Sequence, residues 1–240
     1  MTTLELLALE PPGWGGNLLR GLANSVQIAL GAYAVGLLIG TAGAYGKLYG
    51  GKITKDLLGI YTTLVRAIPE LILILILYFG LTDLINQVML AMGYDRIQIS
   101  GVAAGIAVLG VVQGAYATEV LRGAIQAVPP GQIEAARAMG MSPIMLARRI
   151  TLPAMLGFAI PGMANLWLIA TKDTALLAVV GFAELTQETR QAASTTKAFF
   201  TFFFAAGMLY LILTMVSTWL FARIEAWARR GEPRSSGGGM

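Results

Sequence analysis

The chain has 240 residues, 56% of them hydrophobic and 12% charged, with a mean hydropathy of +0.70 and a net charge of +4. Soluble domains carry about 25% charged residues, so this composition excludes an ordinary soluble enzyme or binding module and predicts an integral membrane protein. Cysteine and histidine are both absent. Their absence from the sequence excludes disulfides, thiolate nucleophiles and the usual zinc sites, so we expect no metal and no cofactor on this chain.

About five transmembrane helices are predicted, in an all-α, polytopic fold. Residues 1–14 contain no basic residue and so lack the positively charged start of a secretory signal. We expect residues 1–17 to form an N-terminal extracytoplasmic segment. Four uncharged runs provide the ~20 residues that a bilayer-spanning helix needs. These runs are 21–46, 97–118, 150–171 and 198–222.

The remaining span, at about 57–81, is predicted to be a broken helix. Three residues interrupt it: Arg66, Pro69 and Glu70. The fourth span of the chain is expected to begin a few residues after Pro153 and to continue toward Gly181. Bundles of four or six helices remain open, because hydropathy does not resolve broken helices.

The lysines and arginines of the short loops predict the orientation, since cytoplasmic loops carry an excess of both. One side is assigned Lys47, Lys52, Lys55, Arg122, Arg137, Arg148, Arg149, Arg223, Arg229, Arg230 and Arg234. The opposite side is assigned Arg20, Arg96, Arg190 and Lys197. An outside N-terminus and an inside C-terminus satisfy this asymmetry. Residues 18–222 then form one transmembrane domain, followed by a flexible, basic cytoplasmic tail at 223–240.

The loop at 122–153, between the third and fourth spans, has the most informative spacing in the chain. It reads Glu-Ala-Ala, three residues, Gly, nine residues, Ile-x-Leu-Pro, and its members are Glu134, Ala135, Ala136, Gly140, Ile150, Leu152 and Pro153. Glu134 and Arg137 are spaced for an i,i+3 pair, and Gly140 suits a left-handed helix end. We expect two short helices joined at Gly140 that dock onto another protein. The alternative is an ordinary amphipathic loop helix, since Ala, Glu and Arg are common helix formers.

The nearest match to a phosphate-binding loop fails at two positions. Thr41 replaces the first glycine, and Leu48 replaces the Ser or Thr that would hold magnesium. We therefore expect no ATP hydrolysis by this chain. If transport is driven by ATP, a partner ATPase subunit binds the ATP and Mg²⁺, and the 122–153 loop receives its motion.

Ionisable side chains inside the spans are costly in lipid and tend to face a cavity or a partner. The candidates for a substrate path are Arg66, Glu70, Asn165, Lys172, Asp173 and Thr174. A zwitterionic solute needs an anion for its ammonium and a cation or helix N-terminus for its carboxylate, and this set supplies both. An equal alternative is that Arg66 and Glu70 neutralise each other, with a kink at Pro69. Glu119 and Arg122 are expected to hold the loop to the bundle.

Small residues recur at four-residue spacing in the spans. The pairs are Gly36 with Gly40, Gly101 with Gly105, and Gly110 with Gly114. Such pairs let helix backbones approach closely in lipid, within one bundle or between two copies. We assign them no function beyond packing.

The 122–153 loop resembles the cytoplasmic coupling loop of ABC importer permeases. Within these, residues 21–222 resemble the polar amino-acid uptake permeases, specifically the histidine, arginine, ornithine and opine branch. The segments that carry the resemblance are 61–71 (YTTLVRAIPEL), 114–124 (GAYATEVLRGA), 161–167 (PGMANLW) and 172–176 (KDTAL). The chain departs from many relatives at Ala175, where they carry Ser, and this weakens any role for a hydroxyl there.

The resemblance implies a type I ABC importer permease fold in the bacterial cytoplasmic (inner) membrane. It implies ATP-driven import of polar, preferentially basic amino acids or opines by alternating access. The implied partners are a homologous second permease, as a heterodimer or homodimer, a pair of ATP-binding subunits, and a periplasmic or extracellular solute-binding protein. Nucleic acid is not an expected partner, because the pI near 9.5 is explained by the basic loops.

Three other classes of function are weighed against this one. An ion channel or proton-coupled carrier would also bury charges in its spans, but it would move solute without ATP. A structural scaffold would not be expected to carry such charges. A membrane-embedded enzyme would depend on carboxylates such as Glu119 or Asp173. We rank the channel or carrier second, the scaffold third and the enzyme fourth.

Overall fold

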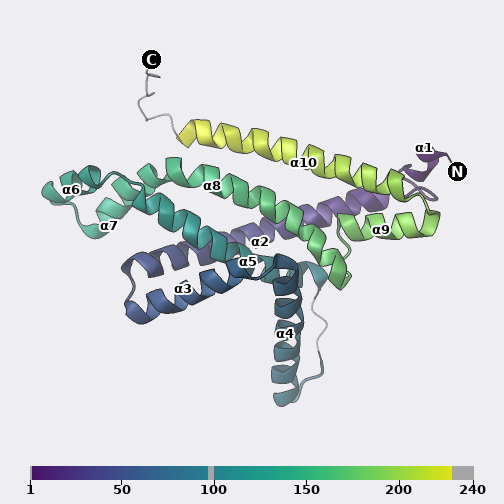
Figure 1. The fold of residues 1–240 in the computed structure, drawn as a ribbon, viewed down its shortest axis with the longest axis horizontal. Coiled ribbons are helices and arrows are strands. Elements are labelled where there is room, and N and C mark those ends of the chain that lie inside the picture. The colour runs from purple at the N-terminus through teal and green to yellow at the C-terminus, as the bar shows by residue number, and fades with distance from the viewer. Residues whose placement is uncertain (1, 97–99, 229–240) are drawn as a thin grey trace.

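The computed structural model describes residues 2–96 and 100–228, and over these residues the fold is all-α, without strands (Figure 1). In chain order the elements are α1 (Thr3–Leu6), α2 (Gly15–Tyr49), α3 (Lys52–Ala67), α4 (Glu70–Ala91), α5 (Gly101–Gln126), α6 (Pro130–Ala138), α7 (Pro143–Leu146), the π-helix η1 (Ala147–Thr151), α8 (Leu152–Asp173), the 3₁₀ helix η2 (Thr174–Val180), α9 (Leu185–Thr196) and α10 (Phe199–Ala228). Five helical stretches are long and apolar enough to cross a membrane: Gly15–Tyr49, Glu70–Ala91, Gly101–Gln126, Pro143–Val180 and Phe199–Ala228. The predicted number of spans is confirmed.

Several helices extend past the charges that marked their predicted ends. α2 begins six residues before the predicted 21–46 span and ends three residues after it. α10 continues through residues 223–228, which the sequence assigned to the flexible tail, while 229–240 lie outside the described residues. Charged residues interrupt a hydropathy profile, but lysine, arginine and glutamate are good helix formers, so helices continue through them.

The fourth span begins before Pro153 rather than after it, which corrects the predicted start. The chain is helical from Pro143 through η1 into α8, and Pro153 lies in the first turn of α8. Proline has no N–H for an intrahelical hydrogen bond, and the wide π turn directly before it accommodates the ring. The predicted continuation past Asp173 is confirmed, and Gly181 ends η2 in the left-handed region with φ of 84°.

The second span is broken at Pro69 as predicted, but its position was wrong. α3 ends at Ala67, residues 68 and 69 are extended, and α4 begins at Glu70. In Figure 1, α3 lies beside α2, whereas α4 leaves the bundle at a steep angle. The helix of membrane-spanning length is therefore Glu70–Ala91 and not 57–81. Arg66 and Glu70 lie on different helices and form no ion pair, so the alternative that they neutralise each other is not seen in the described residues.

Glycines bring α2 and α5 into close contact along most of their length. A Cβ added to Gly40 of α2 would lie only 2.4 Å from the Cβ of Ala117 in α5, and Gly36 is similarly covered by α5. From the other side, Gly110 and Gly114 of α5 lie directly against α2 side chains. These glycines pack two helices of the same bundle, which is one of the two roles that the four-residue spacing left open.

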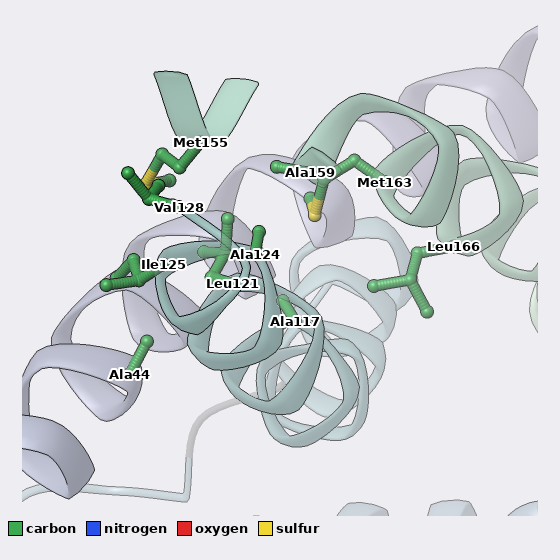
Figure 2. Packing of buried hydrophobic residues seen from close by; sticks show 10 residues of the cluster. All are labelled: Ala44, Ala117, Leu121, Ala124, Ile125, Val128, Met155, Ala159, Met163 and Leu166. Carbon is green, nitrogen blue, oxygen red and sulfur yellow. The ribbon is translucent and has the colours of Figure 1, made fainter. Parts of the chain in front are cut away.

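Another face of α5 packs against α8 through an apolar cluster (Figure 2). Its buried members are Ala44, Ala117, Leu121, Ala124, Ile125, Val128, Met155, Ala159, Met163 and Leu166. α5 therefore lies between α2 and α8 and is the central helix of the bundle.

The two ends of the bundle carry different elements (Figure 1). The short helices α6 and α7, the corner between α2 and α3, and the C-terminal end of α10 lie at one end. Helices α1 and α9 lie at the opposite end. Eight lysines and arginines of the described residues lie in or next to the elements at the first end, which we call the basic end: Lys47, Lys52, Lys55, Arg122, Arg137, Arg148, Arg149 and Arg223.

Gly40→Ala is expected to destabilise the protein, because the added methyl would lie 2.4 Å from the Cβ and 2.9 Å from the carbonyl carbon of Ala117. Overpacking of this kind costs about 1–3 kcal/mol. The matched control is Gly123→Ala in α5, where nothing lies within 4 Å of an added Cβ. Thermal unfolding in detergent should show a lower midpoint only for Gly40→Ala. Equal midpoints for the two variants would contradict a tight α2–α5 contact.

Candidate functional site

At the basic end, α6, α7 and η1 form a compact projection that we call the knob. After α6 the chain turns at Gly140, whose φ of 75° lies in the left-handed region as predicted. Ser142 then caps the start of α7, and its side chain accepts a hydrogen bond from the Met145 amide at 3.4 Å. The π-helix η1 joins α7 directly to α8. The knob is therefore continuous with the apolar helical stretch that ends at Val180.

The motif residues divide into one packing residue and an outward face. Ala136 is 3% exposed, and Ile150 is half-buried. The exposed members are Glu134, Ala135, Gly140, Leu152 and Pro153. No ion pair joins Glu134 to Arg137 in the part of the chain that the structure describes, so the i,i+3 pair allowed by their spacing does not form. Both side chains are exposed and available to a partner.

Two large apolar side chains lie uncovered on the knob. Met139 is 79% exposed and Ile144 is 78% exposed, on either side of Gly140. Neither residue belongs to the motif, and sequence reasoning missed both. The sequence did contain a signal for them, since large apolar residues stand on both sides of the predicted glycine corner in a basic loop. Two large, uncovered apolar side chains on one short projection are candidates for a contact with a protein partner.

A group of charged residues ties α2 and α3 to α5 close to the basic end. The ammonium of Lys47 pairs with one oxygen of Glu119 and donates to the hydroxyl of Thr62 at 2.6 Å. The other oxygen of Glu119 accepts from Arg122 at 2.8 Å. These contacts join α2 and α3 to α5, with Lys47, which the sequence placed only in a basic loop, as the connecting residue. Arg122 contacts Glu119 and Gln126 of its own helix, so the role of Glu119 and Arg122 in holding the loop to the bundle stays a prediction.

A second polar group lies inside the bundle, where α4, α5 and α8 meet. The hydroxyl of Tyr116 donates to Glu70 at 3.2 Å, and the amide nitrogen of Gln113 donates to Asp173 at 3.4 Å. Asp173 and Glu70 also lie close enough for their carboxylates to interact directly. Gln113 is 1% exposed, and its side-chain oxygen has no hydrogen-bond partner. We call Glu70, Gln113, Tyr116 and Asp173 the acceptor cluster.

The structure brings together only some of the candidates for the substrate path. Glu70 and Asp173 belong to the acceptor cluster, and Thr174 is fully buried directly after it. Asn165 and Lys172 are seven residues apart, so they lie on one exposed face of α8. Arg66, at the end of α3, is exposed but close enough to influence the Tyr116 hydroxyl electrostatically. Gln113 and Tyr116 were missed as site residues, because isolated polar residues in an apolar run form no pattern.

The acceptor cluster is not neutralised by any ion pair that the described residues make. The two ion pairs among the described residues both involve Glu119, which is not part of the cluster. The cluster thus holds two carboxylates and one unpartnered amide oxygen, with the cations of Arg66 and Lys172 at its margins. Partly buried acceptors without an ion-pair partner are costly, so a cationic group is the chemical complement of this cluster.

Comparisons with known proteins agree on one family. The model of the family described as "Binding-protein-dependent transport system inner membrane component" matches residues 32–230. The nopaline transport system permease protein NocQ of Agrobacterium fabrum (strain C58) is 40% identical over 230 residues, which are 95% of this chain and 98% of the relative. The histidine/lysine/arginine/ornithine transport system permease protein HisQ of Salmonella typhimurium (strain LT2) is 38% identical, covering 89% and 93%.

Solved structures show the same fold. A chain from the crystal structure of an amino acid ABC transporter with histidines has a TM-score of 0.76 and 28% identity, and the match covers 89% of this chain and 95% of that one. A chain of the inward-facing MetNI methionine ABC transporter has a TM-score of 0.73 and 21% identity, with 89% and 97% covered. The predicted all-α importer permease fold is confirmed.

Lys47→Met is expected to destabilise the basic end, because it removes one of the two cations that contact Glu119. Losing a hydrogen bond to a charged group costs about 1.5–3 kcal/mol. Lys52→Met, at an exposed lysine without an ion pair in the described structure, is the matched control. Thermal unfolding in detergent compares the two variants. A midpoint for Lys47→Met as high as that for Lys52→Met would show that the contact contributes little to stability.

Proposed function

The chain belongs to the family of binding-protein-dependent transport system inner membrane components, and we propose that it is a permease subunit importing polar amino acids or opines. The names of relatives such as NocQ and HisQ support this class of solute. Within this proposal the chain binds no ATP itself, and a partner ATPase supplies the energy. The further proposed partners are a second permease and a solute-binding protein outside the membrane.

We further propose that the basic end faces the cytoplasm of a bacterial inner membrane, with the N-terminus outside and the C-terminus inside. The knob, the α2–α3 corner and the C-terminal end of α10 share that end (Figure 1). Lysine and arginine accumulate on the cytoplasmic side of membrane proteins. The enrichment of both residues in these elements supports the orientation, and α9 then lies on the outer side.

The acceptor cluster is the proposed binding site for the solute, and its lack of a compensating cation is the observation that carries the proposal. Glu70 and Asp173 provide negative charge, and the unpartnered oxygen of Gln113 provides a neutral acceptor. An ammonium group has three N–H donors and no acceptor, so it matches this set. A bound α-amino group, or the cationic side chain of a basic amino acid, would satisfy these acceptors.

The cations at the margins of the cluster fit the opposite end of such a solute. Arg66 and Lys172 are both exposed and make no ion pair within the described residues. A guanidinium binds a carboxylate in a bidentate manner, and an ammonium binds it as a point charge. An amino acid or opine carries both charge signs, so it can bridge from the acceptor cluster to one of these cations.

The knob is the proposed contact with the ATPase. Its exposed Met139 and Ile144 suit an apolar groove on a partner, and the exposed Glu134 and Arg137 suit polar contacts around it. Because η1 joins the knob to α8, a movement of the ATPase would be transmitted to the helix that carries Asp173. This continuity supports an alternating-access mechanism, in which nucleotide binding and hydrolysis change the side from which the cluster is accessible.

Asp173→Asn tests the solute site. Asparagine keeps the shape and the acceptor oxygen for Gln113 but removes the negative charge, so solute affinity should fall roughly tenfold to a hundredfold. Uptake kinetics in liposomes containing the complete importer measure this loss. Asp83→Asn, at an exposed carboxylate of α4, is the control. Unchanged uptake by Asp173→Asn, with normal expression, would remove Asp173 from the solute site.

Gly140→Pro and Glu134→Lys test the coupling role of the knob. Proline cannot adopt the φ of 75° found at Gly140, and lysine reverses the charge of an exposed motif residue. Each variant should insert normally but import much less solute per ATP hydrolysed. Gly131→Ala in α6 is the control, because nothing lies within 4 Å of its added Cβ. Coupling equal to that of the control in both variants would argue against the knob as the coupling element.

A further inference from the structure

At the end of the bundle opposite the knob, Glu184 is a completely buried carboxylate outside the membrane-spanning helices. One oxygen accepts from the Gln187 amide at 2.7 Å. The other accepts from the Thr186 amide at 2.8 Å, the Tyr210 hydroxyl at 3.3 Å and the Ser25 hydroxyl at 3.4 Å. Glu184 therefore caps the N-terminus of α9 and at the same time contacts α2 and α10.

Burying the Glu184 carboxylate costs free energy, because the carboxylate loses its contact with water. Desolvation raises the pKa of the Glu184 carboxyl, and hydrogen bonds from the Thr186 and Gln187 amides oppose that rise. A cap alone does not require a fully buried charge, since exposed Ser, Thr or Asp cap helices equally well. The additional hydroxyl donors from α2 and α10 are consequently the distinctive part of the structure.

The segment that leads to Glu184 is fixed to α2 by two further hydrogen bonds. Asn24 donates to the Ala183 carbonyl at 2.6 Å, and the Leu185 amide donates to the Ser25 hydroxyl at 3.2 Å. Gly21 of α2 also lies against Leu185, because a Cβ there would be 2.9 Å from the Leu185 Cα. The start of α9 is held on α2 at several points.

Tyr210 connects this group of residues to the acceptor cluster. Its hydroxyl contacts Glu184 and Thr186 at 3.3 Å, and the hydroxyl of Thr174 lies near it. Thr174 is fully buried and directly follows Asp173. The short helix η2 begins at Thr174 and is capped by Gly181, so it also leads along the chain from the acceptor cluster toward Glu184. Two connections thus run from Thr174, the first residue of η2, to the start of α9: one through Tyr210 and one along η2.

We propose that Glu184, Tyr210 and Ser25 form a latch that couples occupation of the solute site to the position of α9. The inference rests on the proposed function. The latch residues do not touch the solute; they are positioning residues that act through Thr174 and η2. When solute binds at Asp173, a shift of Thr174 is passed to Tyr210 and Glu184, and α9 changes its exposure on the outer side, where a solute-binding protein docks.

The natural absence of cysteine allows a direct test. Ser194→Cys places a single thiol at an exposed position of α9. In liposomes containing this subunit with its second permease, ATPase and binding protein, the rate of maleimide labelling is measured with and without the transported amino acid. We expect solute to change the labelling rate in the single-cysteine parent. Adding Tyr210→Phe or Glu184→Gln should abolish that dependence while the complex still assembles.

Glu188→Gln, one turn further along α9 and outside the latch, is the matched control and should keep the solute dependence. Tyr210→Phe removes only one hydroxyl, so it decides the question even if Glu184→Gln does not assemble.

Retained solute dependence in Tyr210→Phe would overturn the latch. A parent that imports solute with ATP but labels identically with and without it would overturn the latch and leave the proposed function intact. A parent without ATP-dependent import would overturn both.

Discussion

The close contact between α2 and α5 is the constraint on which the rest of the structure depends. Glycines on both helices remove the side chains that would hold the backbones apart, and a Cβ at Gly40 would lie 2.4 Å from that of Ala117. In lipid, where burial of apolar surface gives little advantage, such packing is a main source of helix association. Because α5 is fixed in this way, Gln113, Tyr116 and Glu119 have defined positions, and the chain that follows α5 leads directly to the knob.

Three groups of buried or half-buried acidic residues follow one another along this scaffold, and they differ in how their charge is satisfied. Near the basic end, Glu119 is paired with cations such as Lys47. At the opposite end, Glu184 is held by backbone amides and hydroxyls. Between them, Glu70 and Asp173 accept hydrogen bonds from neutral donors and form no ion pair within the described residues, with Arg66 and Lys172 at the margins. This difference between the three groups supports the proposal that the third group binds the solute.

The sequence was sufficient for the fold class and the family, because both depend on local patterns. Apolar runs predicted five spans, and the spacing around Gly140 predicted a helical corner and a family that the comparisons confirm. The placement of the second span was wrong, because Pro69 starts a helix as readily as it ends one. Gln113 and Glu184 could not be found, since a single polar residue has significance only through side chains that the fold brings to it.

The central claim is that this chain moves solute only when a partner hydrolyses ATP. The most direct test is to express it with its genomic neighbours, reconstitute the purified complex in liposomes, and measure amino-acid accumulation with and without internal ATP. The account predicts that an ATPase copurifies and that solute delivered by the binding protein stimulates hydrolysis and is accumulated. Solute flux that persists in ATP-free liposomes, without a copurifying ATPase, would contradict it and favour a channel or secondary carrier.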